Sequence, residues 1–156
     1  MCSETSAGKV TVAIGADHAG FPLKEELVRA LTEEGYQPKD FGTFSTASVD
    51  YPDVAVEVAN AVVSGEFERG ILVCGTGIGI TIAANKVPGI RAFACSEAYS
   101  AKMARMHNNA NIIGMGARVV GGGLALDIAK AFLETGFEFG SRHERRVDKI
   151  NALDRK

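Results

Sequence analysis

The chain has 156 residues, 46% of them hydrophobic, and a formal charge of −2 at pH 7, which suits one domain with one buried core. Its Lys, Arg, Asp and Glu residues are intermixed with no sustained basic stripe, and this pattern argues against nucleic acid or a membrane surface as a partner. Because no apolar run reaches the roughly 18 residues that span a bilayer, and the polar start MCSETSAGK lacks a signal peptide's apolar core, we expect a cytoplasmic protein.

Strand-like and helix-like segments alternate in the first half of the chain. The strands are β-branched and apolar, and the helices carry apolar stripes with a 3.6-residue period. Pro38 places its strand at a sheet edge. A Ser- and Thr-rich loop at 42–50 suits either the rim of a binding site or a plain surface connection. In chain order we predict a loose extension at 1–8, a strand at 9–15, a helix over 22–34, a strand at 36–41, a loop at 42–50 and a helix over 51–64.

The second half continues the alternation from a central strand-turn-helix unit at 69–85. The elements predicted after it are a strand at 90–95, a helix over 97–106, a strand at 112–115, a helix over 124–134 and a last helix over about 144–153. Five strands alternating with helices imply a doubly wound five-stranded parallel sheet, a three-layer α/β/α and Rossmann-like single domain over 9–156. Ligands of such sheets bind beyond the carboxyl ends of the strands.

The central stretch, ILVCGTGIGITIAAN, carries the clearest functional signal. An apolar strand ends at Cys74, and Gly75, Gly77 and Gly79 alternate before a helix starts. Backbone N–H groups in such a turn can form a hollow for an anion or a developing oxyanion. A thiol at its lip, near a helix N-terminus, ionises more readily than a free one and can act as a base or nucleophile. The alternative is that Cys74 is an inert small hydrophobe, although a plain connection rarely needs three glycines.

Three polar residues could add acid–base chemistry. Asp17 and His18 follow the first strand and could bind sugar hydroxyls or move protons, or they could simply cap a helix. His107 ends a helix beside two asparagines and could act as an acid, or as a cation that interacts with the helix dipole. The cysteines and histidines lack the spacing of a disulfide framework or a zinc site, so we expect no metal, although the fold could still bring scattered ligands together.

Arginines near the C-terminus could bind a phosphate. Arg142 and Arg146 are four residues apart and would share a helix face, and Arg118 follows the last strand at the ligand edge. The alternative is that this basic face is merely solvated.

Together these motifs resemble one known family. The segments GADHAGFPLK, DYPD, ILVCGTGIGITIAANK, IRAFACSEAYSAKMARMHNNAN, GARVVG and SRHERRV, in this order and spacing, are similar to ribose-5-phosphate isomerase type B. Its wider family includes allose- and galactose-6-phosphate isomerases. The resemblance extends from Lys9 to the C-terminus, with Ser141 standing where glycine is common.

The resemblance implies an aldose–ketose isomerase of the pentose phosphate pathway, which works through a cis-enediolate without metal or organic cofactor. Cys74 would move the proton between C2 and C1, and His107 would assist ring opening. Thr76, with the glycine loop, would hold the developing oxyanion. Some relatives use a glutamate where this chain has Ile78, so the cysteine mechanism is implied. The substrate-binding residues implied are Asp17, His18, Gly75, Gly77, Ile78, Gly79, Asn108, Arg118, Arg142 and Arg146.

The resemblance also implies a homodimer or homotetramer with each site shared between protomers, and the helix face at 103–106 at or near the subunit contact. Three alternatives stay open. The substrate could be a six-carbon sugar phosphate. The glycine loop could belong to a flavodoxin-like or dinucleotide-binding domain, although it follows the third strand and is not a P-loop. The pocket could also belong to a non-catalytic sugar-phosphate sensor.

Overall fold

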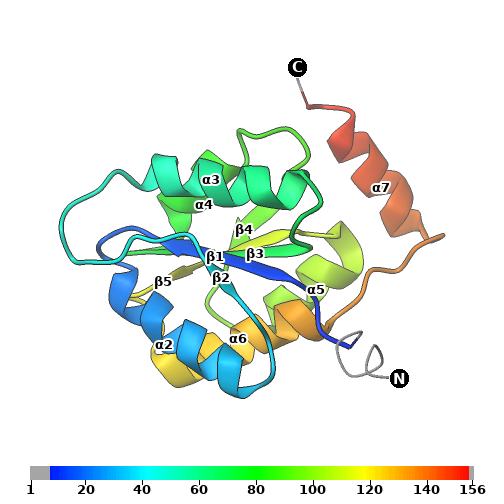
Figure 1. Cartoon of the computed structure of the whole chain (residues 1–156). Coiled ribbons are helices and arrows are strands. Elements are labelled where there is room, and N and C mark those ends of the chain that lie inside the picture. The colour runs from blue at the N-terminus through cyan, green and yellow to red at the C-terminus, as the bar shows by residue number, and fades with distance from the viewer. Residues whose placement is uncertain (1–7, 155–156) are drawn as a thin grey trace.

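Strands and helices alternate through residues 8–154, which are the residues that the computed structural model describes (Figure 1). The strands are β1 (Val12–Ala16), β2 (Lys39–Asp40), β3 (Arg69–Cys74), β4 (Ala92–Ala94) and β5 (Ile112–Gly116). The helices are α2 (Phe21–Glu33), α3 (Tyr51–Val63), α4 (Ile78–Ala84), α5 (Ala98–Asn108), α6 (Gly122–Glu134) and α7 (Arg142–Asn151).

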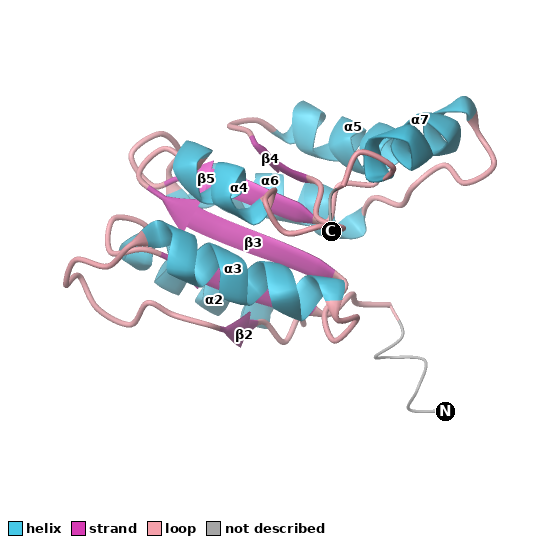
Figure 2. Ribbon diagram, turned by 90° about the horizontal axis from the view of Figure 1, so that it is seen from above, coloured by secondary structure: helices cyan, strands magenta, loops and turns pink. Residues whose placement is uncertain are grey.

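All strand pairs are parallel, and the strand order is β2-β1-β3-β5-β4. β3 is central (Figure 2), with β1 and then β2 on one side and β5 and then β4 on the other. The registers pair Val73 with Ala16 on one side and Cys74 with Gly116 on the other. The three inner strands therefore end together at one edge. The predicted fold class, a doubly wound five-stranded parallel sheet, is confirmed.

Two apolar cores cover the two faces of the sheet. Successive residues of β1, such as Ala13 and Ile14, enter opposite cores, as the two-residue period of a strand requires. One core joins the sheet to α2, α5 and α6, and the other joins it to α3 and α4. Figure 1 shows these helix groups on opposite sides of the sheet, with α7 apart from both layers. Side-chain burial therefore fixes the register that aligns the strand ends.

Several predicted boundaries differ from the observed ones. β1 starts at Val12 rather than at residue 9, and α6 already starts at Gly122, inside the glycine run. α7 starts at Arg142 instead of 144, because the Ser141 side chain caps the helix by accepting a hydrogen bond from the His143 N–H. Residues 1–7 of the predicted extension lie outside the described residues. Within 8–154, no helix has the length and apolarity needed to cross a bilayer.

Candidate active site

Predicted site residues from three strands meet at the carboxyl edge of the sheet. Asp17 follows β1, and its backbone N–H donates to the Val73 carbonyl of β3 at 3.2 Å. The turn after β5 folds back onto β3, since the Arg118 N–H donates to the Gly75 carbonyl at 3.0 Å. The structure thus brings the Asp17-His18 pair, the glycine loop and Arg118 together, as the sequence predicts for this edge.

Cys74 lies deeper than expected. Only 5% of the residue is exposed, and it belongs to the core between the sheet and helices α3 and α4. Cys74 is therefore less exposed than a position at the lip of the hollow suggests, because the last residue of β3 still points into the layer that α3 and α4 cover. Its Sγ accepts a hydrogen bond from the Gly77 N–H at 3.2 Å, which fixes the sulfur toward the glycine loop.

Two of the glycines lie close to other groups, and of these Gly77 is the one that only a glycine can occupy. Gly77 has φ +81°, and a Cβ there would lie 2.9 Å from the carbonyl carbon of Met115. A Cβ on Gly75 would lie 2.9 Å from Nη1 of Arg118. These glycines therefore let the loop pack against the end of β5 and let a guanidinium lie over the loop. A cationic group is thus in place beside the amides that follow Cys74.

The loop over residues 42–50 borders this edge. His18 Nδ1 accepts a hydrogen bond from the Val49 N–H at 3.2 Å, so the loop contacts a predicted substrate ligand. Asp17 is buried and its Oδ1 accepts from the Gly20 N–H at 2.9 Å, which closes the turn before α2 without capping the helix. A pocket of about 280 Å³ lies between this loop and α3. The loop over residues 42–50 therefore forms part of the rim of the candidate site at the carboxyl edge.

Lys24 is a residue that the sequence analysis missed. Its side chain is fully buried, and Nζ donates to Asp40 at 2.7 and 2.8 Å and to the Thr43 carbonyl at 2.7 Å. These contacts join α2 to the edge strand β2 and to the start of the rim loop. A lysine inside the apolar stripe of α2 was the available signal, because a buried ammonium must have partners. Lys24 thus anchors the loop that contacts His18.

The remaining predicted residues lie at the opposite edge of the sheet. Helix α5 leaves the carboxyl end of β4 and returns to the amino end of β5, so His107 and Asn108, in its last turn, lie at the amino edge. Arg142 starts α7, which packs against α5. Within one chain, the structure therefore does not bring His107 and the α7 arginines to Cys74.

The imidazoles of His107 and His143 stack at this amino edge. Their ring centroids are 4.1 Å apart with an interplanar angle of 15°. His107 Nε2 lies 4.0 Å from Oε1 of Glu138. Burial, followed by the positive potential of His107 and Arg142, lowers the pKa of His143. The neutral form of His143 is therefore favoured beside His107.

Two arginines that sequence reasoning missed hold the end of α5. Arg91 donates to the Asn108 carbonyl at 3.2 Å and to the Asn109 carbonyl at 2.9 Å. Arg105 is buried and donates to the Ala110 carbonyl at 2.7 Å. Burial, and then the nearby charges of Arg69 and Arg91, lower the pKa of Arg105 to about 10. These guanidinium groups satisfy carbonyls that the helix leaves free at its C-terminus.

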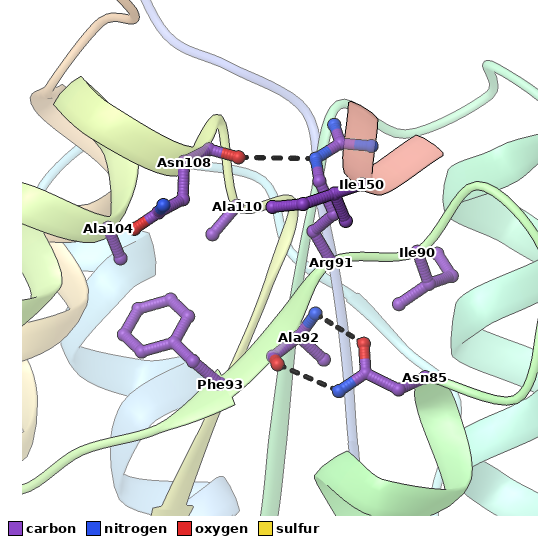
Figure 3. A pocket seen from close by; sticks show the side chains of 9 residues that line it. All are labelled: Asn85, Ile90, Arg91, Ala92, Phe93, Ala104, Asn108, Ala110 and Ile150. Carbon is purple, nitrogen blue, oxygen red and sulfur yellow. Dashed lines mark hydrogen bonds between the residues drawn. The ribbon is translucent and has the colours of Figure 1, made fainter. Parts of the chain in front are cut away.

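A pocket of about 270 Å³ lies beside this turn (Figure 3). Asn108, Phe93 of β4 and Ile150 of α7 are among its lining residues. Asn85 pairs with the backbone of Ala92 through both side-chain amide atoms, at 2.9 and 2.8 Å, so it satisfies part of the outer edge of β4. The amino edge thus has a recess of its own, separate from the glycine loop.

Comparison with known proteins places the fold and these motifs in one family of sugar isomerases. The family model described as Ribose/Galactose Isomerase matches residues 12–150, and the chain belongs to that family. Ribose-5-phosphate isomerase B of Escherichia coli is 50% identical, over 93% of this chain and 97% of that protein. D-erythrulose-4-phosphate isomerase of Pectobacterium atrosepticum is 46% identical, over 93% and 95%.

Solved structures agree. A Clostridium thermocellum ribose-5-phosphate isomerase B is 54% identical, with a TM-score of 0.89 over 92% of this chain and 96% of that one. The resemblance noted in the sequence is therefore confirmed at the level of family and fold. The roles of individual residues stay predictions.

Proposed function

We propose that this protein interconverts ribose 5-phosphate and ribulose 5-phosphate through a cis-enediolate, with Cys74 as the base. The observation that carries the proposal is the hydrogen bond from the Gly77 N–H to Cys74 Sγ, inside a glycine loop at the ligand edge of the sheet. Relatives that are 50% and 43% identical bear the names ribose-5-phosphate isomerase B and ribose-5-P isomerase B.

The chemistry needs a base, donors for an oxyanion and a phosphate anchor. In the proposed reaction the Cys74 thiolate removes the proton from C2 of the open-chain aldose, and the electron pair of that C–H bond forms the enediolate. The hydroxyl proton on O2 passes to O1, and the resulting thiol returns its proton to C1, which leaves the ketose with its carbonyl at C2. The Gly77 N–H donates to Cys74 Sγ and fixes the sulfur toward the glycine loop, where the reacting carbons would bind. Loop amides and Thr76 stabilise the enediolate oxygens, and guanidinium groups fix the phosphate.

The distribution of site residues supports a site shared between two protomers. His107 and the arginines of α7 lie at the amino edge, whereas Cys74 and Arg118 lie at the carboxyl edge. In a two-fold dimer, the amino edge of one protomer faces the carboxyl edge of its partner and completes the set. Ile78 and Ile82 of α4 are 56% and 57% exposed beside the glycine loop, which suits a surface that a second copy covers.

A cysteine comparison tests the assigned base. We expect Cys74→Ala to fold normally and to lower kcat on ribose 5-phosphate by about 10²–10⁴-fold, the usual contribution of a general base. Cys2→Ala and Cys95→Ala are the matched controls and should keep wild-type turnover. Formation of ribulose 5-phosphate is the measurement. Unchanged kcat in the Cys74 variant would refute this base. Binding of ribose 5-phosphate by a wild type that shows no turnover would favour a sensor.

The same assay settles the substrate's chain length. The family description names galactose, and one relative is named for a four-carbon sugar phosphate. We expect the highest kcat/KM with ribose 5-phosphate, compared with allose 6-phosphate and D-erythrulose 4-phosphate. A higher kcat/KM with either of the other two would reassign the substrate and keep the reaction class.

A further inference from the structure

Three potential metal ligands meet where α5, α7 and the segment before α7 converge. They are His107 from the last turn of α5, Glu138 from the segment after α6, and His143 from the first turn of α7. Their candidate ligand atoms all lie within 4.8 Å of one another. The sequence spacing gave no sign of this group, because the two histidines are 36 positions apart and only the fold brings them together.

We propose that His107, Glu138 and His143 form a site for a divalent transition metal such as Zn²⁺, and that a bound ion blocks His107. The set of two imidazoles and one carboxylate matches the ligands of open zinc sites, which complete their coordination with water. Two imidazoles favour Zn²⁺ over Mg²⁺ and Ca²⁺, which prefer oxygen ligands. The blocking rests on the proposed role of His107, whereas metal binding itself does not.

The geometry is close to what one ion requires. Zinc–ligand bonds of about 2.0–2.2 Å place two ligand atoms of the same ion about 3–4 Å apart. His107 Nε2 and Glu138 Oε1 are already 4.0 Å apart. The side chains of His107 and Glu138 are 39% and 45% exposed, so both can rotate toward the ion without disturbing the core. His143 is the buried, fixed member of the set.

Ser141 holds two of the three ligands in register. Its hydroxyl donates to the Glu138 carbonyl at 2.6 Å and accepts from the His143 N–H at 3.1 Å. The Gly140 N–H donates to Glu144 at 2.8 Å and closes the same turn. The backbone around the ligands is therefore preformed, and metal binding needs little chain ordering.

Charge around the site limits its affinity. Arg142 and Arg146 lie near His143 on α7, and their positive charges repel a cation. We therefore expect affinity in the micromolar range rather than that of a closed structural zinc site.

Calorimetric titration of Zn²⁺ into the EDTA-treated full chain at pH 7.5 tests the binding. We expect one Zn²⁺ per chain and no binding of Mg²⁺. Glu138→Gln and His143→Gln should each weaken Zn²⁺ binding by at least about tenfold. The controls His18→Gln and Cys95→Ser should leave the affinity unchanged.

Absence of one-to-one binding, or a wild-type Zn²⁺ affinity in the Glu138 and His143 variants, would overturn the site. If His143→Gln fails to fold, the exposed Glu138 variant decides alone.

Activity tests the blocking separately. Zn²⁺ should inhibit turnover of ribose 5-phosphate by the wild type. Glu138→Gln should keep its basal rate in the absence of Zn²⁺. The Zn²⁺ concentration for half inhibition should rise in this variant by the same factor by which its Zn²⁺ affinity falls. Binding without inhibition would overturn the blocking. A metal-free wild type with no turnover would count against the proposed function, and the titration would still decide the site.

Discussion

Tyr36 shows how one buried polar group ties stability to pH. The residue is 2% exposed, and its hydroxyl donates to Oε2 of Glu134 on α6 at 3.2 Å. Burial, followed by the charge of Glu134, raises the pKa of Tyr36 from 10.0 to about 12. The folded state therefore requires the neutral phenol, since neither the apolar core nor the carboxylate tolerates a phenolate.

Tyr36→Phe should remove part of the alkaline destabilisation. Because the folded pKa lies above the unfolded one, the contribution of Tyr36 is fully present below pH 10 and is lost as the pH rises towards 12. Between pH 9 and pH 11 the wild type should lose about 1 kcal/mol more unfolding free energy than the variant does. Urea unfolding at both pH values measures this difference. Tyr99→Phe, at an exposed site, is the control. Equal losses in wild type and Tyr36→Phe would contradict the assignment.

Single residues were predictable where the fold class alone determines their position. Cys74 ends a strand, and Asp17 and Arg118 each follow one, so a parallel sheet places them at one edge whatever the details. Lys24 and Arg105 were missed, because a 3.6-residue period marks a buried face but cannot name a partner far along the chain. The depth of Cys74 was also beyond the sequence, since it depends on how α3 and α4 cover the end of β3.

At the scale of elements, apolar periodicity predicted every strand and helix of the described residues, while hydrogen bonds set their ends. β1 starts later than its apolar pattern, because only residues from Val12 onward pair with β3. α7 starts earlier than its pattern, because Ser141 caps it. Burial is encoded by many residues at once, whereas a cap depends on one, and this is why the boundaries were less predictable than the elements.

Ser141 offers a test of how α7 presents its arginines. Ser141→Ala removes the cap and should cost about 1 kcal/mol of unfolding free energy, whereas Ser141→Gly should cost only a few tenths. Since Arg142 is the first residue of α7, fraying in the alanine variant should raise KM for ribose 5-phosphate more than in the glycine variant. Thermal unfolding and steady-state kinetics measure the two effects. Equal KM in both variants would mean that the cap does not position the arginines.

At the scale of the whole molecule, the parallel sheet separates the candidate groups. Helix α5 must return from the carboxyl edge to the amino edge before β5 can pair in parallel, so His107 at its end lies across the sheet from Cys74. The family resemblance implied sharing between protomers, and this topology gives it a physical reason. Within one chain, the parallel β4–β5 pairing maintains this separation.

Mixing two inactive variants tests the shared site directly. Cys74→Ala and His107→Ala should each lower turnover, since each breaks every site of its own homodimer. In a mixed dimer with shared sites, one site combines both substitutions and the other combines Cys74 of one protomer with His107 of its partner. Random exchange in equal amounts makes half of the dimers mixed, so about a quarter of all sites should regain wild-type turnover.

The control is the double variant mixed with Cys74→Ala, which cannot form an intact site. If refolding or subunit exchange yields mixed dimers without any gain in turnover, each site lies within one chain, and α5 must then bring His107 to Cys74 by a rearrangement that the parallel sheet opposes.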